Sequence, residues 1–364
     1  TGSCRTPVFR TKTLLQRIIS PVFSWAVLSH PVLSSFEIEG QCAKGEAVQM
    51  NEAIMKKQHA PILAVGNAIV DIIALTDDDF LQKEGMNKGG MQLLEDAADA
   101  ARLYERIGPA TEISGGSAAN TVVGIVSCGG QAGFIGKLGH DDVGAIFAKD
   151  ITAAGVEYVP CYDPEERTGN CIILVTPDAQ RTMNTHLGAT RHLLPQDIDP
   201  ERVAAANWVY LEGYSYDAPS GPACFSHVAD LIKGTDTRLA FSLSDAWCVE
   251  RHHDELLAFI DDHIDLLFGN QIEIEALTGL KGEAMLDAVA GMASEVAVTF
   301  GEEGSVVVSG TERIRVEAKK GISVVDTTGA GDLFAAGYLH ARQLGGSLED
   351  AAMNGTAAAA EIIS

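Results

Sequence analysis

The sequence predicts an α/β fold with a mainly parallel central β-sheet and a second, smaller sheet over one of its edges. From residue 61 onward, short apolar runs alternate with helical patterns, which implies βαβ units. Several of these runs are apolar on both faces and rich in β-branched residues, as strands covered by helices on both sides must be. Two intervals, 69–115 and 157–190, are extended and more polar, and we expect them to form the smaller sheet as a lid.

The expected elements follow one another along the chain in alternation. The expected strands are Ile62–Gly66, Gly133–Gly136, Cys171–Thr176, Trp208–Glu212, Leu239–Leu243, Leu266–Gly269, Val296–Phe300 and Ser305–Val308. The expected helices are Val143–Ala154, Pro222–Lys233, Arg251–Asp262, Gln271–Thr278, Glu283–Ser294, Gly331–Gln343 and Ser347–Ile363.

The composition argues against several classes of function. There are 50 Asp and Glu residues against 26 Lys and Arg, and a surface of that sign repels nucleic acid and anionic lipid. No apolar stretch approaches the roughly 20 residues that span a bilayer. The seven cysteines are scattered, odd in number and never spaced C-x-x-C, which indicates free thiols in a reducing compartment. We therefore expect a cytoplasmic protein that binds neither nucleic acid nor membrane.

The first 55 residues differ in composition from the rest. Residues 1–36 contain four of the basic residues and no acidic one, so the remainder has a formal charge of −28, from 22 basic and 50 acidic residues. The chain begins with Thr, and Met50 and Met55 precede the first strand. We interpret residues 1–55 as an extension, first as translated upstream sequence, second as a targeting segment, and third as a folded element. The main domain is then 56–364, and its end at a helix suggests a truncated reading frame.

The strongest functional signal is Asp326-Thr-Thr-Gly-Ala-Gly-Asp332, between an apolar run and a helical pattern. Gly329, Ala330 and Gly331 leave room for a phosphate to approach backbone N–H groups at the helix N-terminus. Asp332 lies in the first turn, where it can take a proton from a substrate hydroxyl as a general base. The alternative is an ordinary helix start, because acidic residues favour the first turn.

Three further segments carry polar residues at expected turns. Ser114-Gly-Gly-Ser-Ala-Ala-Asn-Thr121 reads by itself as a tight turn before a helix. Gly66-Asn-Ala-Ile-Val-Asp71 follows the first strand, at the sheet edge where α/β proteins bind ligands, and Asp71 can accept two hydrogen bonds from a vicinal diol. Asn270-Gln-Ile-Glu273 opens a helix, which is also its simplest interpretation.

Together these segments resemble the ribokinase-like (PfkB) family of carbohydrate and nucleoside kinases over roughly residues 60–364. Asp326–Asp332 matches the C-terminal signature of that family residue for residue, and Ser114–Thr121 resembles its N-terminal signature. The resemblance implies a ribokinase-like three-layer sandwich with a small β lid. No P-loop sequence is present, and no G-x-G-x-x-G follows the first strand, which argues against a dinucleotide-dependent oxidoreductase.

The resemblance also implies a role for each matching residue. The catalytic set is Asp332 as base and Gly329, Ala330 and Gly331 as anion hole. Arg181 is added to this set from its own position, because it is a scarce cation on a segment near the lid and can clamp the transferring phosphoryl group; a surface salt bridge is the alternative. The acceptor-binding set is Asn67, Asp71, Leu93, Asn120 and the hinge pair Gly115 and Gly116. The ATP-binding set is Asn270, Thr299, Gly301, Gly304 and Thr327. Glu273 is expected to hold Mg²⁺ through water.

Within the family, residues 168–188 and Gly89–Leu93 are most similar to bacterial adenosine kinases. The expected reaction is therefore adenosine + ATP to AMP + ADP, a purine-salvage step, with Mg²⁺ and a monovalent cation such as K⁺ as cofactors. The alternatives are a kinase for ribose, fructose or another nucleoside, and a non-catalytic ligand-binding protein on the same fold. A monomer or a homodimer is compatible with all of these.

Overall fold

The centre of the protein is a nine-stranded sheet in the order β16-β15-β14-β13-β12-β11-β1-β5-β7. The computed structural model describes residues 59–364 except 179, 323 and 325–326, so the extension 1–55 and Asp326 lie outside the described residues. The strands of this sheet are β1 Ile62–Val65, β5 Ala132–Ile135, β7 Glu157–Tyr158, β11 Trp208–Glu212, β12 Arg238–Ser242, β13 Leu266–Asn270, β14 Glu295–Thr299, β15 Ser305–Ser309 and β16 Glu312–Val316. Neighbours from β7 to β14 pair in parallel, and β15 and β16 pair antiparallel.

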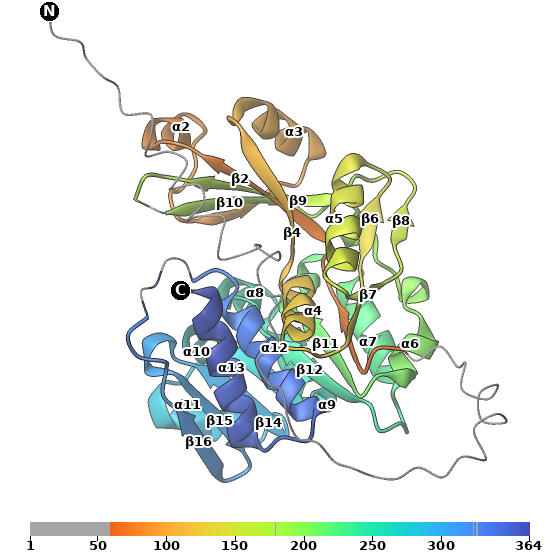
Figure 1. The fold of residues 1–364 in the computed structure, drawn as a ribbon, viewed down its shortest axis with the longest axis vertical. Helices are drawn as coiled ribbons and strands as arrows, with labels where there is room; N and C mark the ends of the chain where they lie inside the picture. Colours follow the sequence, from red (N-terminus) through yellow and green to blue (C-terminus); the bar gives the residue numbers. More distant parts are fainter. Residues whose placement is uncertain (1–58, 179, 323, 325–326) are drawn as a thin grey trace, which may run out of the picture.

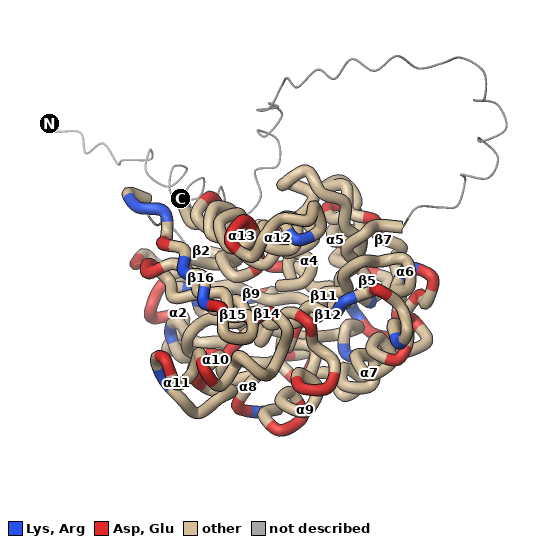
Figure 2. Tube along the Cα trace, turned by 90° about the horizontal axis from the view of Figure 1, so that it is seen from below, with Lys and Arg blue, Asp and Glu red and all other residues tan. Residues whose placement is uncertain are grey.

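Helices cover both faces of this sheet, as Figure 2 shows from below. On one side lie α4 Ser117–Ser127, α5 Asp142–Ala153, α12 Ala330–Gln343 and α13 Leu348–Ile362. On the other lie α6 Pro200–Ala205, α7 Gly221–Leu231, α8 Ala246–Arg251, α9 His253–His263, α10 Gln271–Thr278 and α11 Gly282–Val289. Alternate strand residues enter two separate cores: Ile62 and Ala64 pack on the α4–α12 side, Leu63 and Val65 on the α7–α9 side. The predicted three-layer α/β fold is confirmed.

A second sheet of five strands lies above one end of the large sheet in Figure 1. Its order is β3-β10-β9-β2-β4, with β2 Ile69–Leu75, β3 Met91–Leu93, β4 Ala110–Gly115, β9 Gly169–Val175 and β10 Arg181–His186. We call it the lid sheet. Its strands all fall inside the two intervals that break the alternation in the sequence. The short helices α2 Asp78–Lys83 and α3 Ala97–Arg106 accompany it.

Two of the elements that the sequence did not predict are α8 and β16. The helix predicted over 251–262 is α9, and the short helix α8 before it was not predicted; α8 begins at Ala246, where Asp245 caps it by accepting a hydrogen bond from the Cys248 N–H. His252 then separates α8 from α9 with non-helical dihedral angles. The edge strand β16 was not predicted, because its sequence Glu-Arg-Ile-Arg-Val is largely polar and exposed.

Small residues bring three helices of one layer into close contact. A Cβ atom built at Gly337 of α12 would lie 2.5 Å from the carbonyl oxygen of Asn354 in α13. A Cβ built at Gly124 of α4 would lie 2.7 Å from the Cβ of Ala336. Because neither position has room for a methyl group, α12 is fixed between α4 and α13. None of the helices in the described residues is long and apolar enough to cross a membrane.

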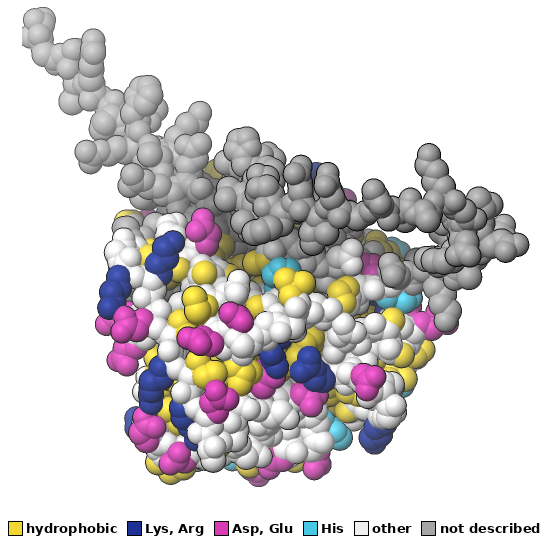
Figure 3. All heavy atoms as spheres, turned by 60° about the horizontal axis from the view of Figure 1, so that its bottom comes forward, with side chains coloured by type: hydrophobic (Ala, Val, Ile, Leu, Met, Phe, Trp, Pro, Cys, Tyr) yellow, Lys and Arg dark blue, Asp and Glu magenta, His cyan; other side chains and the backbone are white. Residues whose placement is uncertain are grey.

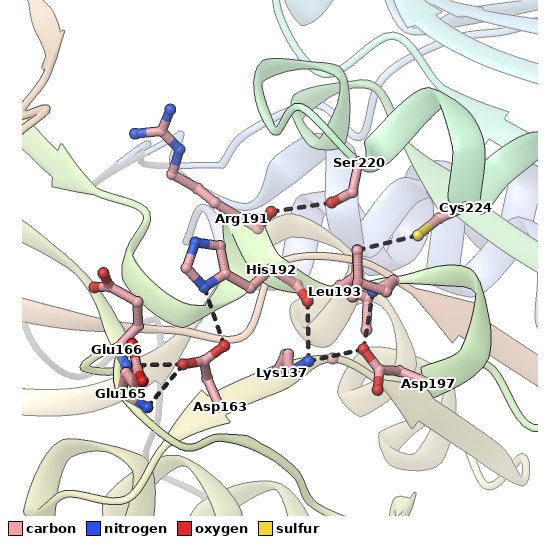
Figure 4. A network of polar contacts seen from close by, with 12 residues as sticks. Lys137, Asp163, Glu165, Glu166, Arg191, His192, Leu193, Asp197, Ser220 and Cys224 are labelled. Carbon is pink, nitrogen blue, oxygen red and sulfur yellow. Dashed lines mark hydrogen bonds and ion pairs between the residues drawn. The ribbon is translucent and has the colours of Figure 1, made fainter.

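A segment of two short 3₁₀ helices connects β10 of the lid sheet to α6. These are η1 Gly188–His192 and η2 Pro195–Asp197, and Figure 4 shows the side chains that hold them. The Nζ atom of Lys137 donates to the His192 carbonyl at 2.9 Å and to Oδ2 of Asp197 at 2.8 Å. Asp163 accepts from the N–H of Glu166 at 2.8 Å and pairs with Nδ1 of His192 at 3.0 Å. We call Lys137, Asp163, His192 and Asp197 the strap network.

The charges of the strap network compensate one another. Lys137 opens β6 Lys137–Gly139, which pairs with β8 Cys161–Asp163, so its ammonium group is held within the fold. Burial by itself would raise the pKa of Asp197, but the hydrogen bonds from Lys137 and from the Leu194 N–H outweigh it and lower that pKa. The pKa of Asp163 is lowered in the same way, by the N–H groups of residues 165 and 166 and by His192, against burial.

Candidate active site

The predicted site residues lie where the parallel strands of the large sheet end. Asn67 follows β1, Glu212 closes β11, and Asn270 closes β13 beside Thr299, its register partner at the end of β14. The N-terminus of α12 brings Asp332 to the same edge. Open α/β sheets bind their ligands at this edge, and the lid sheet lies over it.

Asp332 is held by two side chains of α4. Its Oδ1 accepts from the Ser117 hydroxyl at 2.6 Å, and its Oδ2 accepts from Nδ2 of Asn120 at 3.1 Å. Burial raises the pKa of Asp332, and the bonds from Ser117 and Asn120 counteract that shift without cancelling it. The carboxylate is therefore oriented and has a higher proton affinity than an exposed aspartate, as a general base requires.

The N-terminus of α12 presents backbone N–H groups beside Asp332. Gly329 adopts a left-handed conformation with φ of 75°, which starts the helix at Ala330. The Ala330 N–H donates to the Thr327 carbonyl at 3.2 Å, and the Leu333 N–H donates to the Gly329 carbonyl at 2.9 Å. The N–H groups between them belong to the first turn, where no carbonyl of the helix itself is available. Gly331 is exposed, and a Cβ atom there would meet nothing within 4 Å, so this turn is open to an anion.

Asp71 approaches from the lid sheet. Burial raises its pKa to about 7; the charge of Arg181 lowers it, and the charge of Asp332 raises it further. Because charges act on one another only over short distances in a protein, these effects indicate that Arg181 and Asp332 lie near Asp71. A Cβ atom at Gly115 would lie 2.6 Å from Cγ of Asp71, so the first glycine of the Gly115-Gly116 pair leaves space for this carboxylate.

The junction between lid and body is narrow. Gly116 follows the last residue of β4 and precedes α4, with φ of 96°. A Cβ atom there would lie 2.4 Å from the Asn67 carbonyl oxygen, so only glycine fits. The hydroxyl of Thr190, in η1, accepts from the Ala68 N–H at 3.1 Å and donates to Oδ1 of Asn67 at 3.3 Å. Leu93 lies further out, on the partly buried strand β3.

Asn270 and Glu273 form a reciprocal cap on α10. The Oδ1 atom of Asn270 accepts from the Glu273 N–H at 2.9 Å, and Oε2 of Glu273 accepts from the Asn270 N–H at 2.9 Å. Burial raises the pKa of Glu273 to about 7, and the charges of Asp245 and Asp332 add to that effect. The charges of Asp245 and Asp332 thus lie near enough to Glu273 to raise its pKa, an effect that a nearby divalent cation would relieve.

The residues present fit Mg²⁺ only through water. Both Glu273 oxygens already bind Asn270, and within the described part of the chain no group of three His, Cys, Asp or Glu side chains could hold an ion directly. Mg²⁺ usually keeps several of its waters, so Glu273 could hold it by accepting hydrogen bonds from those waters.

The other residues predicted to bind ATP, Gly301, Gly304 and Thr327, lie in turns or loops, and each has its own local structural role. Gly301 has φ of 56° in the turn after β14, and it is exposed. Gly304 has φ of 99°, and a Cβ atom there would lie 2.0 Å from the Val316 carbonyl, so its identity is explained by contact with β16. Thr327 is exposed before the α12 N-terminus.

The structure adds residues to which the sequence assigned no role. Ser117 donates directly to Asp332, yet it lies inside a motif in which only the glycines and the asparagine were assigned roles. Glu212 closes an otherwise apolar strand, and its carboxylate is completely buried. A charged residue at the carboxyl end of a buried strand was the signal available for it. Asp245, which lies between β12 and α8, was likewise assigned no role from the sequence.

Comparisons with known proteins agree with this geometry. The adenosine kinase of Sinorhizobium meliloti superposes with a TM-score of 0.77 and 43% identity, covering 83% of this chain and 93% of that one. A probable sugar kinase of Rhizobium etli gives 0.78 and 40%, covering 83% and 92%. The adenosine kinase of Saccharomyces cerevisiae is 26% identical over 312 residues, 80% of this chain and 91% of that protein.

The family is established by a match over most of the chain. The family model described as "pfkB family carbohydrate kinase" matches residues 96–364, which include Asp332, Asn120, Arg181 and Glu273. Members of such a family transfer a phosphoryl group to an alcohol. The chain therefore belongs to the pfkB family of carbohydrate kinases and is a phosphotransferase with an alcohol acceptor.

Proposed function

We propose that this kinase transfers the γ-phosphoryl group of ATP to the 5′-hydroxyl of adenosine, giving AMP and ADP. The observation that carries the proposal is Asp332, oriented by Ser117 and Asn120 at the open N-terminus of α12. The acceptor oxygen forms a bond to the γ-phosphorus while the bond to the β–γ bridging oxygen breaks. The hydroxyl proton passes to Asp332.

The neighbouring groups would stabilise charge during transfer. The first-turn N–H groups of α12, within Gly329–Gly331 and Asp332, would bind the oxygens of the transferring group, and Arg181 would clamp it from the lid. Asp71 and Asn67 would hold the sugar hydroxyls. Mg²⁺, held through water near Glu273, would neutralise the β- and γ-phosphate oxygens.

The lid face that carries Asp71 supports a nucleoside acceptor over a free sugar. Register partners on neighbouring strands share a face, and Asp71 pairs with Cys171 while Ile73 pairs with Ile173. That face holds a small apolar cluster separate from the main cores: Ile73, Cys171, Ile173 and Val175, with Ile69, Ile113 and Met183 against it. A planar base can bury a continuous apolar face there, whereas a free sugar is covered with hydroxyl groups and has much less apolar surface to bury. Two of the similar proteins are also named adenosine kinases.

A substrate panel tests this proposal. Purified protein is given ATP, Mg²⁺ and, in turn, adenosine, other nucleosides, ribose or fructose, and ADP formation is measured. Highest kcat/KM with adenosine is expected. Higher kcat/KM with ribose or fructose would replace adenosine by a sugar, in line with the R. etli relative. Binding of adenosine without turnover on any acceptor would favour a non-catalytic ligand-binding protein.

The resemblance to the family extends the proposal to ions, compartment and assembly. Omitting Mg²⁺ should abolish turnover, and replacing K⁺ by a larger organic cation should reduce it. Equal rates in both buffers would remove the monovalent ion from the proposal. We further propose a cytoplasmic monomer or homodimer with residues 1–55 outside the kinase domain, so a variant starting at residue 56 should keep full activity.

A further inference from the structure

Glu212 is a fully buried carboxylate at the end of β11. Its exposed fraction is 0%, and both of its oxygens are bound by backbone N–H groups. Oε1 accepts from the Asn67 N–H at 2.6 Å, and Oε2 accepts from the Ala118 N–H at 2.7 Å. Such a group is costly to bury and is retained only where its partners are fixed.

The two N–H groups belong to the two halves of the site. Asn67 lies in the loop between β1 and the lid strand β2, which carries Asp71. Ala118 lies in the first turn of α4, next to Ser117 and two residues before Asn120, which together hold Asp332. One carboxylate therefore connects the acceptor-binding loop to the residues that orient the base.

Glu212 also replaces a missing cap on α4. The N-cap residue of that helix is Gly116, which has no side chain to accept from the first-turn N–H groups. The carboxylate of Glu212 takes this place for Ala118, and a negative charge at a helix N-terminus is favourable. The chain also leaves space for it: a Cβ atom at Gly66 would lie 2.7 Å from Cδ of Glu212.

We propose that Glu212 is a positioning residue for phosphoryl transfer, which sets the placement of the acceptor loop at Asn67 relative to the Ser117–Asp332 pair. The inference rests on the proposed function, because it assumes that Asn67 lies at the acceptor and that Asp332 is the base. Glu212 itself touches neither reacting atom. Its effect on the rate passes through the backbone of residues 67 and 118.

The carboxylate is required because it offers two acceptors to two donors. In Glu212→Gln one oxygen becomes an NH₂ group, which would face the N–H of either Asn67 or Ala118. One hydrogen bond is lost and two donors oppose each other, although the size of the side chain is kept. Glu212→Asp keeps both oxygens but is one methylene shorter, so it should disturb the site less.

Steady-state kinetics on the full-length chain with ATP and adenosine test the inference. For Glu212→Gln we expect kcat to fall at least tenfold and the KM for adenosine to rise severalfold, with the KM for ATP within twofold of the unchanged protein. Glu212→Asp should lie between the two. A kcat for Glu212→Gln within twofold of the unchanged protein would overturn the inference.

The matched control is Asp163→Asn in the strap network. Asp163 is also buried, with 6% exposed, and it also accepts from two backbone N–H groups, those of Glu165 and Glu166. It should lose a similar amount of thermal stability with kcat unchanged. If Asp163→Asn lowers kcat as much as Glu212→Gln does, the role of Glu212 is general stability and the inference fails.

A double-mutant cycle with Ser117→Ala keeps the test valid if Glu212→Gln folds poorly, because the cycle can be run with Glu212→Asp. If Glu212 acts through α4, the two effects on kcat are less than multiplicative, whereas multiplicative effects contradict the inference. Turnover of the unchanged protein is measured first. Its absence with adenosine and with all sugars would refute the proposed function, whereas the three outcomes named for the variants refute this inference while the unchanged protein still turns over.

Discussion

Two groups of buried or half-buried carboxylates in this protein have pKa values shifted in opposite directions. In the strap network, Asp163 and Asp197 have cationic or potentially cationic partners, and the pKa of each is lowered. Around the candidate site, Asp71, Glu212 and Glu273 have pKa values raised to about 7, mainly by burial. The difference is the partner: the strap network has the ammonium group of Lys137, whereas Glu212 and Glu273 are bound by backbone N–H groups and by the side-chain amide of Asn270.

The comparison separates stability from chemistry. A compensated carboxylate fixes a segment and resists protonation, so it contributes mainly to folding. A carboxylate held without full compensation stays close to the pH at which it exchanges protons, which is typical of functional sites. Acidic side chains on the surface are of neither kind; on the face in Figure 3 they are dispersed among Lys, Arg, His and hydrophobic side chains.

The largest effect is expected for Asp332→Asn. The variant keeps the shape of the side chain but removes the base, so kcat should fall by roughly 10²–10⁴-fold. Adenosine and ATP should still bind, as measured by isothermal titration calorimetry. Near-normal kcat would show that Asp332 is not the base and that the raised proton affinity there has no catalytic use.

Next in size is Lys137→Met in the strap network. Removing the ammonium leaves Asp197 partly buried without its partner, which should cost about 3 kcal/mol of unfolding free energy. We place the cost at the low end for such pairs because Asp197 keeps 17% of its side chain exposed. Chemical denaturation measures it, and kcat should stay within twofold. The double variant Lys137→Met/Asp197→Leu should recover part of the loss; no recovery would mean that the charge is not the cause.

A smaller effect is expected for Asp71→Ala. Loss of hydrogen bonds from a charged acceptor to the sugar should weaken adenosine binding by about 1.5–3 kcal/mol, or roughly 10- to 100-fold in Kd. The KM for ATP should change little, because Asp71 lies on the lid side. An unchanged adenosine Kd would take Asp71 out of the acceptor site.

The smallest effect concerns pH between 6 and 8. A carboxyl with a folded pKa of about 7 and an unfolded value near 4 binds more protons when folded, so its contribution to stability is lost as pH rises through 7. Unfolding free energy should therefore fall as pH rises, by at most about 1.4 kcal/mol per pH unit for each such group. Strap carboxylates titrate only at acidic pH and add no slope here. Asp71→Asn should reduce the slope, while an unchanged slope would contradict the assignment of Asp71.

Much of the fold could be predicted from the sequence, because apolar runs and helix patterns are local properties. β11 and α10 match their predicted bounds, and the lid strands fall in the two irregular intervals. The edge strand β16 and the helix α8 were missed, since the first is largely polar and the second depends on a cap at Asp245.

The sequence predicted only those site residues to which a resemblance or an unusual position in the chain assigned a role. Asp71, Asn120, Arg181, Glu273 and Asp332 are brought into one region, and their proposed roles stay predictions. Ser117 and Glu212 could not be assigned from sequence, because their partners lie 215 and up to 145 positions away along the chain. Such contacts depend on which strand ends meet, and that is fixed only by the completed sheet.

The tight contacts of α12 with α4 and α13 have a consequence for how a site of this kind assembles. Asp332 belongs to a helix that a single methyl group at Gly337 or Gly124 would displace. Asp71 belongs to a sheet joined to the body near Gly116. The body is thus the fixed part of this arrangement, so a movement of the lid sheet would carry Asp71 toward a stationary Asp332.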